Sequence, residues 1–298
     1  MTTTGTEDVK ELLRAACDQA GIDTRGAEPI RLGENAIFRL PGGIVARIAR
    51  PGQLDAASRE VRIARWLADH DIPAVRALDD LGQPIEAHGR AVTFWHELPD
   101  HHNGTPAQVA TALRRLHDLP VVAGQHPFSA LEPFVRLDER ITAATSLTDD
   151  DRAWLHQHLA TLQESYHHLP AGLPHTVLHG DAWVGNVVAT NDNQVVLLDL
   201  ERASIGPPEW DLVSTAIKHT SFAWITADEY RNFCHRYGHD VTAWDGFALL
   251  RDIRELRMTC YLAQHAAENP RAHQEAELRV SCLRGRNGPR PWSWSPAS

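Results

Sequence analysis

The sequence His179-Gly180-Asp181-Ala182-Trp183-Val184-Gly185-Asn186 holds an imidazole, a carboxylate and an amide side chain close together along the chain. A second carboxylate, Asp199, follows within the apolar run Val195–Leu200. The polar stretch Asn191-Asp192-Asn193 precedes this run, and such a stretch between apolar segments predicts a β-hairpin. The pattern therefore predicts that two carboxylates and an amide flank one hairpin.

These residue types suit the transfer of a phosphoryl group from a magnesium-bound nucleotide to a hydroxyl group. Asp181 would hold the hydroxyl in line, because this reaction gains most from positioning and charge neutralisation. Asn186 and Asp199 offer the oxygen ligands that Mg²⁺ prefers. Alone, His179-Gly180-Asp181 would be better explained by an aspartate that caps a turn, but the spacing to Asn186 and Asp199 favours catalysis. Glu201 would lie on the same side of a continuing strand as Asp199, as an accessory carboxylate or a surface glutamate.

Composition indicates an ordinary globular protein of 298 residues, with 43% hydrophobic and 23% charged residues. The net charge of −10 argues against nucleic-acid binding, which needs a basic face. It is compatible with a cationic small substrate, although an acidic surface for solubility explains it as well. The sequence shows no secretory signal, no apolar run of roughly 20 residues and no C-x-x-C pair, which predicts a cytoplasmic protein with reduced thiols and no membrane span.

The first hundred residues alternate helical and β-like patterns. Helices are predicted at 6–20 and about 55–70, a hairpin at 37–40 and 44–48, and a buried strand at 91–95. The polar, turn-rich stretch Leu98–Gly104 then marks a change of composition. We therefore expect two domains, a β-rich N-terminal nucleotide-binding lobe over 1–98 and a catalytic and acceptor-binding lobe over 99–298.

The second part is predicted to be mainly helical, interrupted by the strands at 176–200. Helices are expected at 106–117, from Thr148 to about 168, after the capping box at Thr226–Glu229, and around Leu249–Cys260. The tail 289–296 cannot be helical and is expected to pack its tryptophans across a surface. The fold class that follows is α+β and bilobal, with a small β-rich lobe and a larger helical lobe.

Further segments accompany the stretch 179–186 and Asp199. Leu198-Asp199-Leu200-Glu201 is followed by Gly206-Pro207-Pro208-Glu209-Trp210-Asp211-Leu212, and a leucine- and histidine-containing helix, Leu113–Pro120, lies upstream. Together with the stretch 179–186, these segments resemble the aminoglycoside phosphotransferase and choline kinase-like superfamily, which shares the protein-kinase fold. The resemblance covers nearly the whole chain. It implies a phosphotransferase that uses Mg²⁺ and ATP, with GTP as an alternative donor.

Residue by residue, the resemblance implies that Asp181 is the catalytic base and that Asn186 and Asp199 are magnesium ligands. His179 would order the catalytic loop. Asp211 matches a buried aspartate that braces this loop from the following helix, although an N-cap for a helix beginning at Leu212 explains it too.

The nucleotide side of a kinase-like lobe needs a strand cation for the phosphates and a helix carboxylate that holds it. Arg47 and Glu60 are the candidates, with Arg50 as the competing cation, and arginine can bind both groups. A loop containing Gly33 and Asn35 would cover the phosphates. The final candidates are Glu97 and Leu98, in a hinge whose backbone would contact the adenine of the nucleotide.

The expected acceptor is a hydroxylated small molecule, such as an aminoglycoside or other antibiotic, an amino sugar or a small alcohol. Acidic residues that could meet a cationic acceptor are Asp228, Glu229, Asp252 and Glu255, although solvated helix faces explain them as well. Three alternatives stay open: a nucleotide-binding pseudokinase-like regulatory module without turnover, a protein kinase, and a metal-dependent hydrolase. A protein kinase is disfavoured because the chain lacks a D-F-G triplet. The histidine pairs at 101–102, 156–158 and 167–168 lack zinc-ligand partners and are interpreted as structural or solvated.

Overall fold

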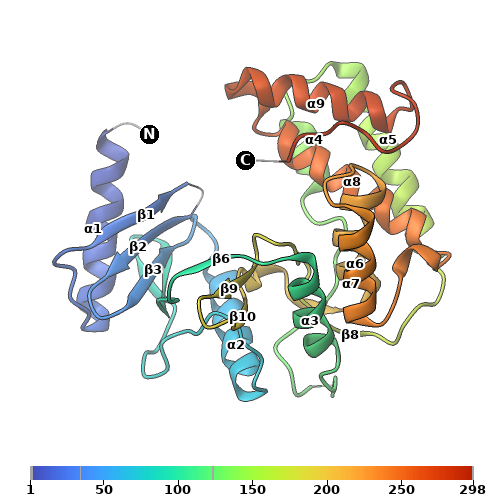
Figure 1. Cartoon of the computed structure of the whole chain (residues 1–298). Helices are drawn as coiled ribbons and strands as arrows, with labels where there is room; N and C mark the ends of the chain where they lie inside the picture. The colour runs from blue at the N-terminus through green and yellow to red at the C-terminus, as the bar shows by residue number, and fades with distance from the viewer. Residues whose placement is uncertain (1–2, 34, 123, 297–298) are drawn as a thin grey trace. The chain divides into compact units, whose positions relative to one another are not determined.

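A computed structural model of the chain describes residues 3–33, 35–122 and 124–296. The chain forms two compact units, each assembled from two segments (Figure 1). Unit 1 comprises Met1–Ser129 and Val184–Ser204, and unit 2 comprises Ala130–Trp183 and Ile205–Ser298. These units divide the chain elsewhere than after residue 98, because 99–129 and 184–204 pack with the first unit. The functional boundary between 1–98 and 99–298 stays a prediction.

Unit 1 is built on a five-stranded antiparallel sheet of strand order β1-β2-β3-β5-β4. Its strands are β1 (Glu28–Leu32), β2 (Ala36–Leu40), β3 (Ile44–Ile48), β4 (Ile85–Ala87) and β5 (Arg90–His96). The predicted hairpin is confirmed: β2 and β3 pair directly through a turn in which Gly42 and Gly43 have φ of 81° and 72°. Glycine suits this turn because it adopts positive φ without a steric cost.

Helix α1 (Thr3–Ala20) packs on this sheet and forms one hydrophobic core with it. Leu13, Ala16 and Cys17 from the helix join Phe38 and Phe94 from the strands, and all are almost completely buried. Figure 1 shows the helix in blue beside the β1–β3 ribbons. The helix predicted at 6–20 is therefore confirmed, and its apolar residues form one face that is buried against the sheet.

The rest of unit 1 carries three further helical segments and a second sheet. Helix α2 (Leu54–Asp69) buries Glu60, Ile63 and Leu67, and α3 (Pro106–His117) begins with a capping box from Thr105. The second sheet has the order β10-β9-β6, from β6 (His101–Asn103), β9 (Val187–Thr190) and β10 (Val195–Leu197). It confirms the hairpin predicted around Asn191-Asp192-Asn193 and leads into a short 3₁₀ helix, η1 (Leu200–Arg202).

Unit 2 is mainly helical, as the sequence predicts. Its sheet has the order β7-β11-β8, and the elements are β7 (Ser129–Ala130), α4 (Leu137–Ala143), α5 (Asp149–Tyr166), β8 (Thr176–Leu178), β11 (Ser204–Gly206), α6 (Glu209–Thr220), α7 (Ala227–Tyr237), η2 (Val241–Ala243), α8 (Phe247–Ala263), η3 (Ala266–Glu268) and α9 (Pro270–Leu283). The β-rich first part and helical second part confirm the predicted α+β fold class. Within the described ranges, no helix is long and apolar enough to cross a membrane.

The C-terminal tail differs from its prediction in one respect. Residues 289–296 are not helical, as expected, but Trp292 and Trp294 do not lie across a surface. They are only 7% and 2% exposed, and Trp294 stacks on both Phe222 and Trp292. The prediction failed because a polar, proline-rich sequence gives no sign of the apolar pocket that another part of the fold provides.

Candidate active site

A buried ion pair between Arg47 and Glu60 forms the centre of the site in unit 1. One guanidinium nitrogen of Arg47, on β3, lies 2.7 Å from both carboxylate oxygens of Glu60, on α2. The Glu60 side chain is only 7% exposed. The sequence named Arg50 as the competing cation, but Arg47 is the one that pairs with Glu60.

Two further carboxylates surround this guanidinium. Glu201 lies 3.5 Å from Arg47, and Asp199 acts on it through the electrostatic field. Burial lowers the pKa of Arg47, but the three carboxylates more than offset this effect and raise it. Burial also raises the pKa of Glu60, and Asp199 and Glu201 add to that rise against the opposing effect of Arg47. Arg47 thus faces three carboxylates, and one of them, Glu201, also lies 3.7 Å from Arg202.

The predicted magnesium ligands lie on adjacent parts of unit 1. The backbone N–H of Leu198 donates a hydrogen bond of 2.8 Å to the carbonyl oxygen of Asn186, immediately before Asp199. Asp199 has φ of 51° and ψ of 71°, a left-handed conformation that is uncommon for a residue with a side chain. The chain then enters η1, so the extended run does not continue to Glu201 as the strand interpretation assumed. Glu201 reaches Arg47 from the 3₁₀ turn instead.

The remaining nucleotide candidates fall in different places of unit 1. Asn35 lines a pocket with Arg47, Arg50, Glu60 and Glu201, whereas Gly33 is not among its lining residues and donates its N–H to the Asn35 carbonyl. Glu34, in the loop proposed to cover the phosphates, lies outside the described residues.

The hinge candidates line another cavity. Glu97 and Leu98 belong to a cavity of about 380 Å³ whose other walls come from α2, residues 71–76 and β10. The Glu97 carboxylate accepts a hydrogen bond from Arg39, and its backbone N–H donates to the Gly43 carbonyl. The structure therefore brings Asn35, Arg47 and Glu60 together but does not place Glu97 or Leu98 in that pocket.

In unit 2, the loop that carries Asp181 is held by Asp211. The Asp211 carboxylate is fully buried and accepts hydrogen bonds from the backbone N–H groups of His179, at 2.8 Å, and Gly180, at 2.9 Å. Because α6 begins at Glu209, Asp211 lies in its first turn and is not an N-cap. The bracing role that the resemblance implies therefore matches the structure. The Asp181 N–H donates to Nδ1 of the buried His179 at 3.3 Å.

Two residues that the sequence analysis did not select complete this loop. Trp210 donates its indole N–H to the Gly180 carbonyl at 3.0 Å. Arg254, on α8, donates to the same carbonyl at 3.1 Å, lies 4.0 Å from the Trp210 ring centroid and is 3.8 Å from the Asp181 carboxylate. Arg254 is far from the motif in sequence, and a single arginine on a helix gives no signal of such a role.

The acidic residues considered for a cationic acceptor have other partners. Asp228 pairs with Arg231, and Glu229 caps α7 through Thr226. Asp252 and Glu255 both pair with Arg290 from the tail. These four carboxylates therefore serve local helix ends and tail docking.

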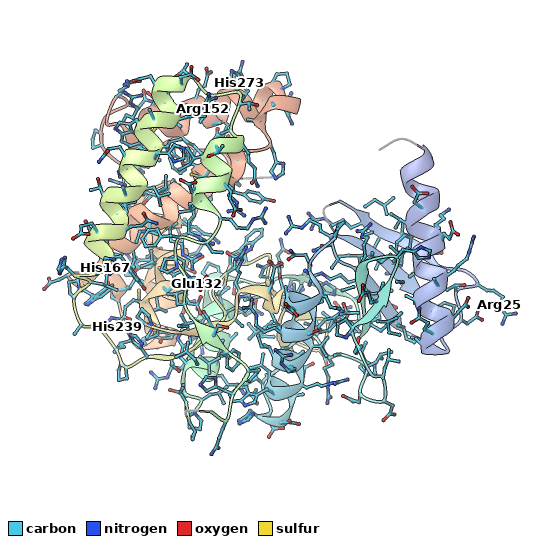
Figure 2. The ribbon with its side chains drawn as sticks, turned by 180° about the vertical axis from the view of Figure 1, so that it is seen from behind. Arg25, Glu132, Arg152, His167, His239 and His273 are labelled. Atoms are coloured by element: carbon cyan, nitrogen blue, oxygen red, sulfur yellow. The ribbon has the colours of Figure 1, made fainter. Side chains whose placement is uncertain are left out.

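Two of the histidines considered in the sequence analysis have partners within unit 2. His156 lies 3.0 Å from Asp138, and His158 stacks on Trp154, where burial lowers its pKa. Figure 2 shows His273 well apart from His167 and His239 in unit 2. Within the part of the chain that the structure describes, no group of three or more His, Cys, Asp or Glu side chains could hold a metal ion. Asn186 and Asp199 alone would thus supply only part of a coordination shell.

Comparison with known proteins identifies the class of this protein as a phosphotransferase. A family model described as "Phosphotransferase enzyme family" matches residues 28–250, and the chain belongs to this family, APH. No curated protein matches the chain.

Solved structures of related fold include kinases of several kinds. Aminoglycoside phosphotransferase APH(3'')-Id from Streptomyces rimosus is 24% identical, with 85% of this chain and 98% of that chain covered and a TM-score of 0.60. A choline/ethanolamine kinase family protein from Mesorhizobium loti is 20% identical, with 94% of each chain covered and a TM-score of 0.62. Amicoumacin kinase hAmiN, in complex with AMP-PNP, Ca²⁺ and Ami, is 14% identical, with 93% and 96% covered and a TM-score of 0.66.

Proposed function

We propose that this chain transfers the γ-phosphoryl group of magnesium-bound ATP, or GTP, to a hydroxyl group of a small molecule. The observation that supports the proposal is the backbone hydrogen bond of 2.8 Å from the Leu198 N–H to the Asn186 carbonyl oxygen, which pairs the chain at Asn186 with the residue that precedes Asp199. Family membership supports phosphoryl transfer, and the structure of hAmiN with AMP-PNP supports a nucleotide donor.

The residues of unit 1 fit a divalent cation. Asn186 and Asp199 offer oxygen ligands, and the left-handed backbone of Asp199 is of the kind that clusters at functional sites. Asn186 and Asp199 would hold Mg²⁺, which takes only a few protein oxygens and completes its shell with phosphates and water. When bound, the ion would offset the negative charge of the phosphates.

Arg47 would contact the donor phosphates from β3. Glu60 fixes its guanidinium in a two-oxygen contact, and a preorganised cation stabilises developing charge without reorganising during the reaction. Asn35 and Arg50 line the same pocket and would add polar contacts to the phosphates.

Asp181 would orient the acceptor hydroxyl and receive its proton. The acceptor oxygen forms a bond to the γ-phosphorus while the bond to the β,γ-bridging oxygen breaks, so that the nucleoside diphosphate leaves. The hydroxyl proton passes to Asp181 late in this step, because a loose transition state does not need a free alkoxide. His179 and Asp211 keep the loop in the required conformation through the hydrogen bonds at Gly180 and Asp181.

The test is nucleoside-diphosphate release from magnesium-ATP, with and without a panel of hydroxylated acceptors. Asp181→Asn should lower the rate of acceptor-stimulated release at least about 100-fold. Asp245→Asn is the matched control, because Asp245 is an exposed aspartate of the same unit. An Asp181→Asn variant as active as the parent would contradict the role of Asp181.

Nucleotide binding distinguishes turnover from the pseudokinase alternative. Magnesium-dependent ATP binding that Asp199→Asn weakens, without diphosphate release under any acceptor, would favour a regulatory module. Release that requires an acceptor would exclude it.

A further inference from the structure

We propose that the acceptor carries a carboxylate, which the ammonium group of Lys218 binds while its hydroxyl lies at Asp181. This inference rests on the proposed function and assigns the substrate class of the same site. Lys218, Trp183 and Asp181 form the acceptor subsite in this proposal, and all three belong to unit 2.

The subsite combines a cation, an aromatic face and the proposed base. The Lys218 ammonium, on α6, lies 5.3 Å from the centroid of the Trp183 ring. Trp183 is 40% exposed and follows Asp181 by two residues, and the Asp181 side chain is 48% exposed. The ring and the carboxylate are thus both accessible to a small molecule, and the ammonium lies over the ring.

Lys218 is a cation whose hydrogen-bonding capacity is available. Among the described residues, no side chain accepts a hydrogen bond from its ammonium, although the group feels the charges of Asp181 and Arg254. Burial lowers the pKa of Lys218 to about 8, Asp181 opposes this shift, and Arg254 adds to it. A buried ammonium gains much from an added anion, because its attraction to that anion is weakly screened.

Arg254 cannot take this role in the same way. It donates to the carbonyls of Gly180 and Trp210 and stacks on the Trp210 ring, so its guanidinium holds the loop. Of these two cations, Lys218 is therefore the one that is not engaged in holding the loop.

A cationic acceptor fits this subsite poorly. Lys218 and Arg254 would both repel an ammonium group placed beside Asp181. The carboxylates that could attract one, on α7 and α8, are already paired with arginines or with a helix cap. Charge in this part of unit 2 therefore favours a hydroxy acid over an amino sugar or an amino alcohol.

The chain contains only two lysines, Lys10 and Lys218, which makes the binding test specific. Protein labelled with ¹³C-lysine gives two sets of Cε signals, and Lys10→Arg assigns them. The probes are glycerate, glyceramide, glycerol and 3-aminopropane-1,2-diol, which share a diol and differ in one substituent. Glycerate should shift the Lys218 signal in a saturable manner with Kd below about 100 mM, at least about tenfold tighter than the other three.

Lys10 lies on α1 of unit 1 and should not respond in the same titration. No saturable shift of the Lys218 signal with glycerate, or an equal response to glycerate and glyceramide, would overturn the proposal. Equal binding of the amino diol would overturn it too.

Turnover supplies the second readout. For every acceptor that stimulates diphosphate release, we expect kcat/KM to be at least about tenfold higher for the carboxylate than for its carboxamide, and Lys218→Met to remove this preference. Lys218→Arg should restore part of it, because the positive charge returns. An equal loss of rate with charged and neutral acceptors in Lys218→Met would instead assign Lys218 to the transferred phosphoryl group and overturn the proposal.

The binding test separates failure of this inference from failure of the proposed function. Asp181→Asn should abolish release while glycerate still shifts the Lys218 signal. A glycerate-specific shift in a protein that releases no diphosphate would retain the anion subsite and reject the kinase. Diphosphate release that neutral and anionic acceptors stimulate equally would retain the kinase and reject the anion subsite.

Discussion

The buried carboxylate of Asp211 accepts a hydrogen bond of 2.9 Å from the backbone N–H of Gly180, whose φ is 82°. The neighbouring His179 N–H donates to the other carboxylate oxygen. One side chain from α6 thus satisfies two consecutive buried donors and fixes the backbone immediately before Asp181. A carboxylate is suited to this task, since both of its oxygens accept.

Asp211→Asn tests this bracing. An amide offers one acceptor and turns its NH₂ group toward the other N–H, so a buried donor loses its partner. We expect a loss of about 2–3 kcal/mol in the free energy of unfolding, together with a lower kcat. Urea titration and steady-state kinetics measure the two effects. Asp245→Asn should change stability by less than about 0.5 kcal/mol, and a similar small change in Asp211→Asn would refute the bracing role.

Replacement of Arg47 should affect both nucleotide use and pH dependence. Arg47→Met removes the charge that opposes the raised pKa of Glu60, so this pKa should rise further. A carboxyl whose folded pKa exceeds its ordinary value of 4.5 binds more protons in the folded state, and stability then falls as pH rises through the folded pKa. The variant should therefore lose most stability, relative to the parent, near neutral pH and least below about pH 4.5.

Urea unfolding between acidic and neutral pH measures this effect, and the KM for the nucleotide should rise at least about tenfold. Arg39→Met is the control, because Arg39 pairs with Glu97 at the surface of the same sheet and is half exposed. A stability loss that does not depend on pH would show that Glu60 stays ionised without its partner.

The lowered pKa of Lys218 makes stability rise with pH, whereas the raised pKa of Glu60 makes it fall. Its folded pKa of about 8 lies below the ordinary value of 10.5, so the unfolded chain binds more protons between these values and stability rises with pH there. Below pH 8 the charged, buried ammonium costs stability in full. Lys218→Met should therefore be as stable as the parent or more stable at pH 7, and this advantage should shrink as the pH rises above 8. Unfolding midpoints at several pH values test the sign.

Binding of an anion should follow the same titration. Glycerate affinity is expected to fall as the pH rises through about 8, because Lys218 loses its charge there. An affinity that does not change between pH 7 and 9 would contradict the assignment of the ammonium as the binding group.

The ion pair between Arg290 in the tail and Glu255 on α8 gives a separate stability prediction. Arg290 donates at 2.8 and 2.5 Å to Glu255, whose side chain is fully buried. Arg290→Met should cost about 3–5 kcal/mol, because it leaves a buried carboxylate without its partner. The double variant Arg290→Met with Glu255→Leu should recover most of this loss. Arg286→Met, at a half-exposed position with ion pairs of 3.9 and 4.0 Å, should stay within about 0.5 kcal/mol of the parent.

Local patterns predicted much of this protein. The hairpin at Gly42 and Gly43, the capping box at Thr226 and the helix over 106–117 all follow from short-range chemistry, and the structure contains each of them. The Arg47–Glu60 ion pair was also expected from the kinase-like arrangement of a strand cation and a helix carboxylate.

Features that depend on distant segments could not be predicted in this way. Trp294 is buried because Phe222 and Arg279 form its surroundings, and neither lies near it in sequence. Lys218 meets Trp183 for the same reason. Glu201 was misplaced on a strand because nothing in the apolar run signals the left-handed backbone of Asp199, which turns the chain into a 3₁₀ helix.

The interleaving of the two compact units has a consequence for synthesis. Unit 1 needs Val184–Ser204, so a nascent chain cannot complete its second sheet until this segment has left the ribosome. A fragment ending at Ser129 would keep Arg47 and Glu60 but would lack Asn186 and Asp199. Residues 130–183, which belong to unit 2, are therefore synthesised before unit 1 has all of its residues. No uninterrupted piece of this gene encodes either unit alone.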